Sequence, residues 1–234
     1  MAEPLLLVSD LTKNFGRFCA LDGVGLDLGA GEVVGLVGPN GSGKTTLINV
    51  VSGLYPPTRG TVTLAGRPVH GGAPHTVVRS GMNRTFQIAK PLGGLTVEEN
   101  LRLAGASAGH RPLPEGDLLQ LVGLSGLQGR VAGSLNASQQ KRLDLARALA
   151  TGPRVLLVDE LGAGLSPAEL DQAAGILRQL AEAGMALLVV EHLMGFLAKV
   201  TRAVVVLNAG RQIFRGDLDQ AVQDPEVVRV FLGG

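Results

Sequence analysis

The residues with the clearest chemical meaning form one glycine-rich segment near the N-terminus. The segment fits the pattern of a phosphate-binding P-loop, and its residues are Gly38, Pro39, Asn40, Gly41, Ser42, Gly43, Lys44, Thr45 and Thr46. Glycines let backbone N–H groups turn inward around phosphate oxygens, and a helix that begins at the loop adds the positive end of its dipole. We expect Lys44 to bridge the β- and γ-phosphates of a nucleoside triphosphate and the Thr45 hydroxyl to bind Mg²⁺. The alternative is an ordinary glycine turn between a strand and a helix.

Two acidic residues further along the chain suit the same chemistry. Asp159 and Glu160 follow an apolar run directly, at the point where a buried strand would end. We expect Asp159 to hold Mg²⁺ through water, and Glu160 to orient and activate the attacking water. Many strands end in acidic residues, so the pair alone is a weak signal. The pair indicates hydrolysis of a nucleotide only because the phosphate loop lies upstream in the same chain.

Short apolar runs and amphipathic stretches alternate along the chain and must position these residues. Strands are predicted at 5–8, 24–28, 32–37, 154–160, 185–192 and 203–210, with a hairpin at 61–69. Helices are predicted from Lys44 to about Ser52 and over 97–105, 117–124, 139–150 and 168–184. Thr96 followed by Glu99 has the pattern of a capping box at the start of the second of these helices.

The order of these elements predicts one α/β domain over residues 1–234. Strand–helix–strand alternation after residue 153 implies parallel pairing. We expect residues 1–87 and 153–234 to form the α/β core, with an antiparallel, β-rich N-terminal part. Residues 88–152 contain no convincing strand and are expected to form a helical subdomain inserted into that core.

The composition narrows the class of protein. Hydrophobic residues make up 45% and charged residues 18%, which is typical of a globular chain. The net charge of +1, the scattered basic residues and the 3% of aromatics argue against nucleic acid as a partner. A single cysteine, Cys19, fits a reducing compartment. The start of the chain lacks a basic n-region, and no apolar run approaches the roughly 20 residues of a membrane helix, so we expect a cytosolic protein.

A longer series of motifs gives the chain a family resemblance. In order, it carries Phe15-Gly16, the phosphate loop, Arg84-Thr-Phe-Gln87, Leu135-Asn-Ala-Ser-Gln-Gln140, Leu157-Val-Asp159-Glu160, Gly164-Leu-Ser-Pro167 and Glu191-His192. This series resembles the nucleotide-binding domain of ABC transporters over essentially its full length. The resemblance implies a P-loop NTPase core of RecA-like type with an antiparallel β subdomain and a helical insertion. It also implies ATP and Mg²⁺ as cofactors.

The same resemblance implies individual roles for residues outside the phosphate loop. Phe15 stands where the family stacks an aromatic ring on adenine, and Gln87 where a glutamine contacts the metal and the membrane subunit. His192 stands where a histidine contacts the γ-phosphate. The signature segment, with Asn136, Ser138 and Gln139, would reach the ATP held by the opposite protomer. The plainer alternatives are a core position for Phe15, a solvated loop residue at Gln87 and a structural histidine at 192.

The resemblance further implies a function and a set of partners. ATP would be hydrolysed between two head-to-tail protomers on the cytoplasmic face of a membrane. The partners would be integral membrane permease subunits, a second ATPase subunit and, indirectly, an extracytoplasmic binding protein. Within the family, the motifs are most similar to uptake ATPases for branched-chain and other hydrophobic amino acids. The lipopolysaccharide-export ATPases, a non-transport ABC protein of translation or DNA repair, and a non-hydrolysing regulatory nucleotide binder are the alternatives.

The signature segment departs from the family pattern of Leu-Ser-Gly-Gly-Gln. Asn136 replaces the serine, and Ala137 and Ser138 replace the two glycines. A Cβ at position 138 would obstruct the approach of the backbone to a γ-phosphate, unless Ser138 acts as a helix N-cap and still binds. Leu161 and Ser166 depart from the usual proline and Asp or Asn. We therefore expect a heterodimer with a partner of better signature, and a homodimer as the alternative.

Overall fold

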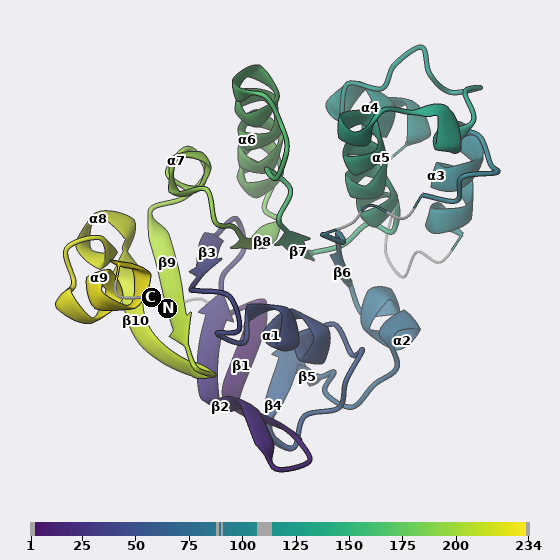
Figure 1. Ribbon diagram of the computed structural model, residues 1–234. Helices are drawn as coiled ribbons and strands as arrows, with labels where there is room; N and C mark the ends of the chain where they lie inside the picture. Colours follow the sequence, from purple (N-terminus) through teal and green to yellow (C-terminus); the bar gives the residue numbers. More distant parts are fainter. Residues whose placement is uncertain (1–2, 88, 90, 107–113, 233–234) are drawn as a thin grey trace.

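A six-stranded sheet forms the centre of the molecule. The computed structural model describes residues 3–87, 89, 91–106 and 114–232. The strands follow the spatial order β10 (Arg211–Asp217), β9 (Ala203–Asn208), β3 (Val33–Val37), β8 (Ala186–Val190), β7 (Val155–Asp159) and β6 (Met82–Arg84) (Figure 1). Neighbouring strands pair in parallel, except that β10 pairs antiparallel with β9. The predicted parallel pairing of 154–160 with 185–192 is therefore confirmed.

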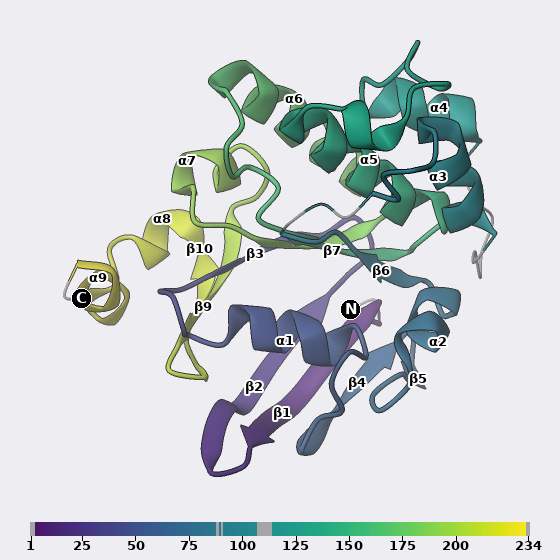
Figure 2. The same cartoon turned by 45° about the vertical axis from the view of Figure 1, so that its right-hand side comes forward.

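Apolar side chains cover both faces of this sheet, which is why its central strands are continuous apolar runs. In β7 the side chains of Leu156 and Val158 belong to one core, while those of Val155 and Leu157 belong to the other. Helices pack on the first face, and a second sheet with helix α1 packs on the opposite face (Figure 2). The carboxyl ends of the parallel strands stay open at one edge, where ligands bind in sheets of this type.

The second sheet is antiparallel and comes from the N-terminal part of the chain. Its order is β2 (Phe18–Leu28), β1 (Leu6–Phe15), β4 (Arg59–Leu64) and β5 (Arg67–Pro68). Helix α1 (Lys44–Val51) lies between this sheet and the six-stranded sheet (Figure 2). The hairpin predicted at 61–69 is confirmed as β4 and β5. The strands predicted at 5–8 and 24–28 prove to be parts of a much longer hairpin.

A group of helices lies to one side of the central sheet (Figure 1). It contains α3 (Val97–Gly105), α4 (Glu115–Leu121), the short 3₁₀ helix η1 (Ala132–Ser134) and α5 (Ala137–Ala150). The predicted capping box is confirmed, because the Thr96 side chain accepts from Glu99 N and the Glu99 carboxylate accepts from Thr96 N. The bounds 88–152 for a separate subdomain stay a prediction, and its residues 88, 90 and 107–113 lie outside the described residues.

The remaining helices surround the core. They are α2 (Pro74–Arg79), α6 (Pro167–Glu182), α7 (Met194–Leu197), α8 (Leu218–Ala221) and α9 (Pro225–Leu232). Of these, α6 was predicted as 168–184, whereas the others and strands β6 and β10 were not predicted. Several of the missed elements have only three or four residues, too few to show a hydrophobic period. In the part of the chain that the structure describes, no helix combines the length and apolarity needed to cross a membrane.

Candidate active site

The phosphate loop occupies the turn from β3 into α1, as its motif predicts. Gly43 caps the helix with a φ of 107°, and Gly38 has a φ of 151°. A Cβ on Gly38 would stand 2.2 Å from Leu207 O, and one on Gly43 would stand 2.9 Å from Ala20 O. Glycine is therefore required at both ends of the loop, for its backbone conformation and for the close approach of neighbouring backbone.

Lys44 lies folded over the loop that precedes it. Its Nζ donates to Gly38 O at 2.7 Å and to Pro39 O at 3.0 Å, and the residue is 6% exposed. Burial lowers the pKa of Lys44, while the nearby charges of Glu160 and Asp159 oppose that shift. An ammonium group has three donor protons, so one remains for a ligand beyond these two carbonyls. The Ser42 hydroxyl beside it is buried without a hydrogen-bond partner.

Three polar side chains meet where three neighbouring strands end. Glu160 follows β7, Gln87 follows β6 and His192 follows β8. Gln87 Nε2 donates to Glu160 Oε2 at 2.7 Å, and His192 Nε2 lies 2.9 Å from Glu160 Oε1. One carboxylate is thus held from two sides by groups from the adjacent strands. Glu160 itself adopts a left-handed backbone conformation with a φ of 47°, which is unusual for a residue with a side chain and typical of functional sites.

Asp159 is engaged by a residue whose role the sequence did not predict. Arg84 Nη2 lies 3.0 Å from Asp159 Oδ2, and their side chains are 10% and 4% exposed. Burial raises the pKa of the Asp159 carboxyl, and the charge of Arg84 opposes this shift. Arg84 Nη1 also donates to Asn49 Oδ1 of α1 at 2.5 Å. Arg84 therefore joins the strand before Gln87 to the carboxylate beside Glu160 and to the helix of the phosphate loop.

These elements enclose a pocket of about 300 Å³. It is lined by Phe18, Ala20, Asn40, Gly41, Ser42, Gly43, Lys44, Thr45, Thr46, Gln87, Glu160 and His192. The structure thus brings loop residues 40–46 together with three of the predicted side chains from the strand ends, whereas Gly38 and Pro39 do not line the pocket. A loop of inward backbone N–H groups, an ammonium and a helix start form a site for an anion of the size of a phosphate chain.

The donors at this pocket also fit Mg²⁺. Thr45 offers a hydroxyl and Gln87 an amide oxygen at the pocket, and Asp159 directly precedes the lining residue Glu160 in the chain. Among the described residues, no group of three or more His, Cys, Asp and Glu residues forms a complete cage for a metal ion. Mg²⁺ is commonly held by one or two carboxylates together with substrate phosphates. The residues present therefore suit a Mg²⁺ ion that arrives with a nucleotide.

The aromatic residue that lines the pocket is Phe18, whereas the sequence motifs predict Phe15. Phe15 is 44% exposed, so the alternative of a core position is wrong. Its ring meets Tyr55 edge-on at 5.5 Å, and Lys13 Nζ lies 5.0 Å from its centroid. Phe18 pairs directly with Phe15 across the hairpin and lines the pocket. Directly opposed residues project from the same face of a sheet, but Phe15 is not among the residues that line the pocket, and its stacking on adenine stays a prediction.

The altered signature segment begins helix α5 and does not line this pocket. Asn136 is the N-cap: its side chain accepts from Gln139 N at 2.8 Å, and Gln139 Oε1 accepts from Asn136 N at 3.1 Å. The alternative that Ser138 acts as the N-cap is therefore wrong, because Ser138 is the second residue of the helix. Its hydroxyl has no hydrogen bond of standard geometry, and it lies close enough to Glu169 to influence its carboxylate.

The two further departures also have structural explanations. Ser166 caps α6 in a capping box with Glu169. The Ser138 hydroxyl, followed by the backbone and side chain of Ser166, lowers the pKa of Glu169 to about 2. Leu161 is buried against the core at 5% exposure. A serine is a good N-cap, and a leucine fills the core, so both substitutions are compatible with a stable fold.

Comparison with known proteins places this architecture in a family. Residues 21–163 match the model of the ABC transporter family. The chain is 35% identical over 257 residues to the high-affinity branched-chain amino acid transport ATP-binding protein BraF of Pseudomonas aeruginosa, covering 100% of this chain and 99% of the relative.

Solved structures agree with that assignment. The ADP conformation of an ATP-binding cassette of an ABC transporter superposes with a TM-score of 0.90 at 30% identity, covering 100% of both chains. A dimeric cassette in a post-hydrolysis state, bound to ADP and Pi, superposes with a TM-score of 0.80 at 25% identity, covering 91% of this chain and 98% of that one. The resemblance seen in the sequence is thereby confirmed: this chain belongs to the ABC transporter family, as an ATP-binding subunit that hydrolyses ATP.

Proposed function

We propose that ATP is hydrolysed at the 300 Å³ pocket by in-line attack of water, with Glu160 as the general base. The observation that carries this assignment is the position of the Glu160 carboxylate. It lies at the pocket that contains the phosphate loop and is held between Gln87 at 2.7 Å and His192 at 2.9 Å. A general base must lie within hydrogen-bond reach of the water it activates, and a carboxylate fixed on both sides is oriented for that role.

The other residues of the pocket have complementary roles in this proposal. Lys44 and the N–H groups of the loop bind the β- and γ-phosphates, and His192 contacts the γ-phosphate. Thr45, Gln87 and Asp159 hold Mg²⁺, which neutralises charge on the phosphate oxygens when it is bound. Arg84 keeps the Asp159 carboxylate ionised and in place within a buried environment. Phe15, on the same face as Phe18, stacks on the adenine ring.

Two protomers act together in this function, with ATP between them. Asn136, Ser138 and Gln139 lie outside their own protomer's pocket, which suits a role at the ATP of the opposite protomer. The related dimeric cassette bound to ADP and Pi supports such an arrangement. Closure on ATP binding and opening after hydrolysis form a two-state switch. Because the signature of this chain is altered, the preferred partner is a second ATPase subunit with an intact signature.

In this proposal, closing and opening of the dimer drive the uptake of branched-chain or other hydrophobic amino acids. The similarity to a branched-chain amino acid transport protein over its full length supports this cargo. The chain would bind integral membrane permease subunits on the cytoplasmic face of the membrane, and an extracytoplasmic binding protein would deliver the amino acid to them. Uptake of labelled leucine by vesicles containing the permeases, the binding protein and this chain tests the cargo. Transport of another substrate class, with no leucine uptake, would overturn it.

The catalytic assignment is tested by Glu160→Gln. The amide keeps the shape and much of the hydrogen bonding but removes the base, so we expect hydrolysis to fall by at least about 100-fold. ATP affinity should stay within about twofold, because the phosphate contacts are unchanged. Glu182→Gln, at an exposed position of α6, is the matched control and should hydrolyse ATP at the wild-type rate. Hydrolysis is measured in single-turnover experiments with labelled ATP, and near-wild-type turnover by E160Q would refute the role of Glu160.

A further inference from the structure

Lys141 makes an unusual contact between the signature helix and the catalytic turn of the same protomer. It is the fifth residue of α5, and its ammonium group reaches the turn that follows β7. Its Nζ donates to Glu160 O at 3.1 Å, to Leu161 O at 3.2 Å and to Ala163 O at 2.5 Å. An ammonium has three protons to donate, so these carbonyls use all of them.

The turn that Lys141 binds is the one that carries the proposed base. Glu160 is in the left-handed region at a φ of 47°, and its N–H donates to Val190 O at 3.0 Å. On another side, Gly162 N donates to Glu191 Oε1 at 2.7 Å. A backbone in this conformation persists only where surrounding contacts hold it. Lys141 supplies these contacts on the carbonyl side, and Glu191 supplies one on the N–H side.

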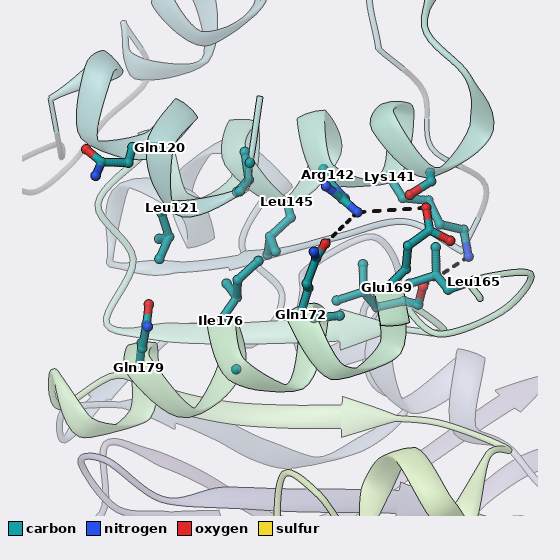
Figure 3. Close-up of a pocket in the computed structure, with 16 residues that line it drawn as sticks. Gln120, Leu121, Lys141, Arg142, Leu145, Leu165, Glu169, Gln172, Ile176 and Gln179 are labelled. Carbon is teal, nitrogen blue, oxygen red and sulfur yellow. Dashed lines mark hydrogen bonds and ion pairs between the residues drawn. The ribbon is translucent and has the colours of Figure 1, made fainter. Parts of the chain in front are cut away.

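Polar contacts hold the boundary between α5 and α6 around Lys141. A cavity of about 480 Å³ lies there, lined by residues of α4, α5 and α6 and by the turn after Glu160 (Figure 3). Arg142 spans it, with Nη2 2.9 Å from Gln172 Oε1 and 3.8 Å from Glu169 Oε1 (Figure 3). Because a cavity cannot transmit position by close packing, the direct bonds of Lys141 are what link α5 to the turn that carries Glu160.

We propose that Lys141 is a positioning residue for hydrolysis, which fixes the Glu160 turn relative to the start of the signature helix. This inference rests on the proposed role of Glu160 as the base. Lys141 lies on the same helix as Asn136 and Gln139, the residues proposed to contact the ATP of the opposite protomer. A shift of α5 would therefore move the base of one ATP site and the signature contacts of the other together. The two sites of a dimer would be coupled through this one side chain in each protomer.

The plainer reading is that Lys141 only stabilises the fold. The two hypotheses predict different effects of removing Lys141 on kcat, on the affinity for ATP and on the melting temperature. A positioning role acts through Glu160, so it lowers kcat, leaves the affinity for ATP unchanged and disappears once the base is absent. A stabilising role lowers the melting temperature and reduces hydrolysis by the same factor in any background.

The test compares Lys141→Met, Glu160→Gln and the double variant in single-turnover hydrolysis of labelled ATP. A displacement of about 1 Å in a catalytic group can reduce the rate by about 100-fold, so we expect K141M to lose between about 10- and 100-fold. ATP binding by calorimetry should stay within about twofold of wild type. In the E160Q background, K141M should change the residual rate by less than about twofold, because the coupled residues are not additive. Lys199→Met is the control, since it removes an exposed lysine paired with Asp171.

Each result has a defined meaning. If K141M hydrolyses ATP within about twofold of wild type, or loses the same factor with and without Glu160, the positioning role is refuted. Loss of ATP binding together with hydrolysis would also refute it. If E160Q itself keeps near-wild-type turnover, the proposed base is wrong, which is a different failure. Should K141M not fold, Lys141→Gln is measured in its place, because its shorter side chain has two donor protons for the three carbonyls. A loss of hydrolysis that disappears in the E160Q background is again expected, and the same fractional loss with and without Glu160 would refute the positioning role.

Discussion

Arg84→Met tests what holds the Asp159 carboxylate in place beside Glu160. Methionine keeps an unbranched side chain of similar length but removes the guanidinium. Arg84 and Asp159 are almost fully buried, and their atoms lie 3.0 Å apart. The substitution therefore leaves the Asp159 carboxylate in a buried environment without the charge that opposes its desolvation.

The expected size of the effect follows from that burial. Breaking a buried ion pair by removing one partner costs about 3–5 kcal/mol. The bond from Arg84 to Asn49 is lost as well, and we take about 4 kcal/mol as the total for the variant, since these losses are not additive. For a chain of this size, 1 kcal/mol shifts the melting temperature by about 2–4 °C, so we expect a fall of about 8–16 °C.

The effect should depend on pH in a defined direction. Burial raises the pKa of Asp159 above its ordinary value, and without Arg84 it rises further. A carboxyl with a raised folded-state pKa favours folding at pH values below its unfolded pKa, and this contribution is lost as the pH rises through the folded pKa. The gap in stability between R84M and the wild-type chain should therefore be largest at neutral pH and smaller near pH 5.

Urea unfolding at pH 7.5 and pH 5 measures both the size of the stability loss and its dependence on pH. The second arm of the experiment is Asp159→Asn, alone and combined with R84M. Because the amide carries no charge, the double variant should recover about 2 kcal/mol relative to the sum of the single effects. Additive losses, or a loss in R84M that stays the same or grows at pH 5, would show that the pair is not what stabilises this side of the pocket.

Two further predictions concern the nucleotide itself. Lys44→Ala should weaken ATP binding by at least about 100-fold, because it removes the ammonium from the phosphate loop, and unchanged affinity in calorimetry would refute the site. Reverting the signature with Asn136→Ser and Ser138→Gly should raise the steady-state hydrolysis of the purified chain by about tenfold, since backbone donors could approach the γ-phosphate closely. An unmodified chain that is fully active alone, and unaffected by the reversion, would remove the argument for a heterodimer.

The parts of the site that the sequence predicts are those fixed by local rules. Gly38 and Gly43 are needed because a Cβ would collide with neighbouring backbone. The positions of Lys44 and Thr45 are set locally, because both lie in the first turn of the helix that follows. Glu160 and His192 end strands that alternate with helices, and parallel strands bring their carboxyl ends to one edge. Their contact could therefore be expected once the strands were recognised. The capping box of Thr96 and Glu99 is equally local.

The contacts that could not be predicted depend on how separate elements are placed. Strand β6 has only three residues and no visible periodicity, so nothing in the sequence aligns Arg84 with Asp159. Lys141 reads as an ordinary polar position of an amphipathic helix, and its three carbonyl partners lie 19 to 22 residues away. Phe18 lines the pocket because the hairpin of β1 and β2 continues to its tip, well beyond the apolar runs that signalled its strands.

The positions that depart from the family pattern do not line this chain's own pocket. Lys44, Thr45, Glu160 and His192, which line the pocket, and the neighbouring Asp159 all keep the expected residue types. Asn136, Ala137 and Ser138 lie at the start of α5 and Ser166 at the start of α6, and Asn136 and Ser166 each cap a helix through a capping box. Leu161 lies in the turn after β7. Asn and Ser are strong N-caps, so these replacements preserve the helix starts within the protomer. In the dimer that we propose, they change the groups that face the partner's ATP. Both caps contribute to the stability of this chain, whereas in the proposed dimer the phosphate contacts that they replace matter only in the other subunit's site. In the proposed heterodimer, a partner with an intact signature would supply those contacts to the pocket of this chain, so a complete set of hydrolytic residues and an altered signature could function together in one protein.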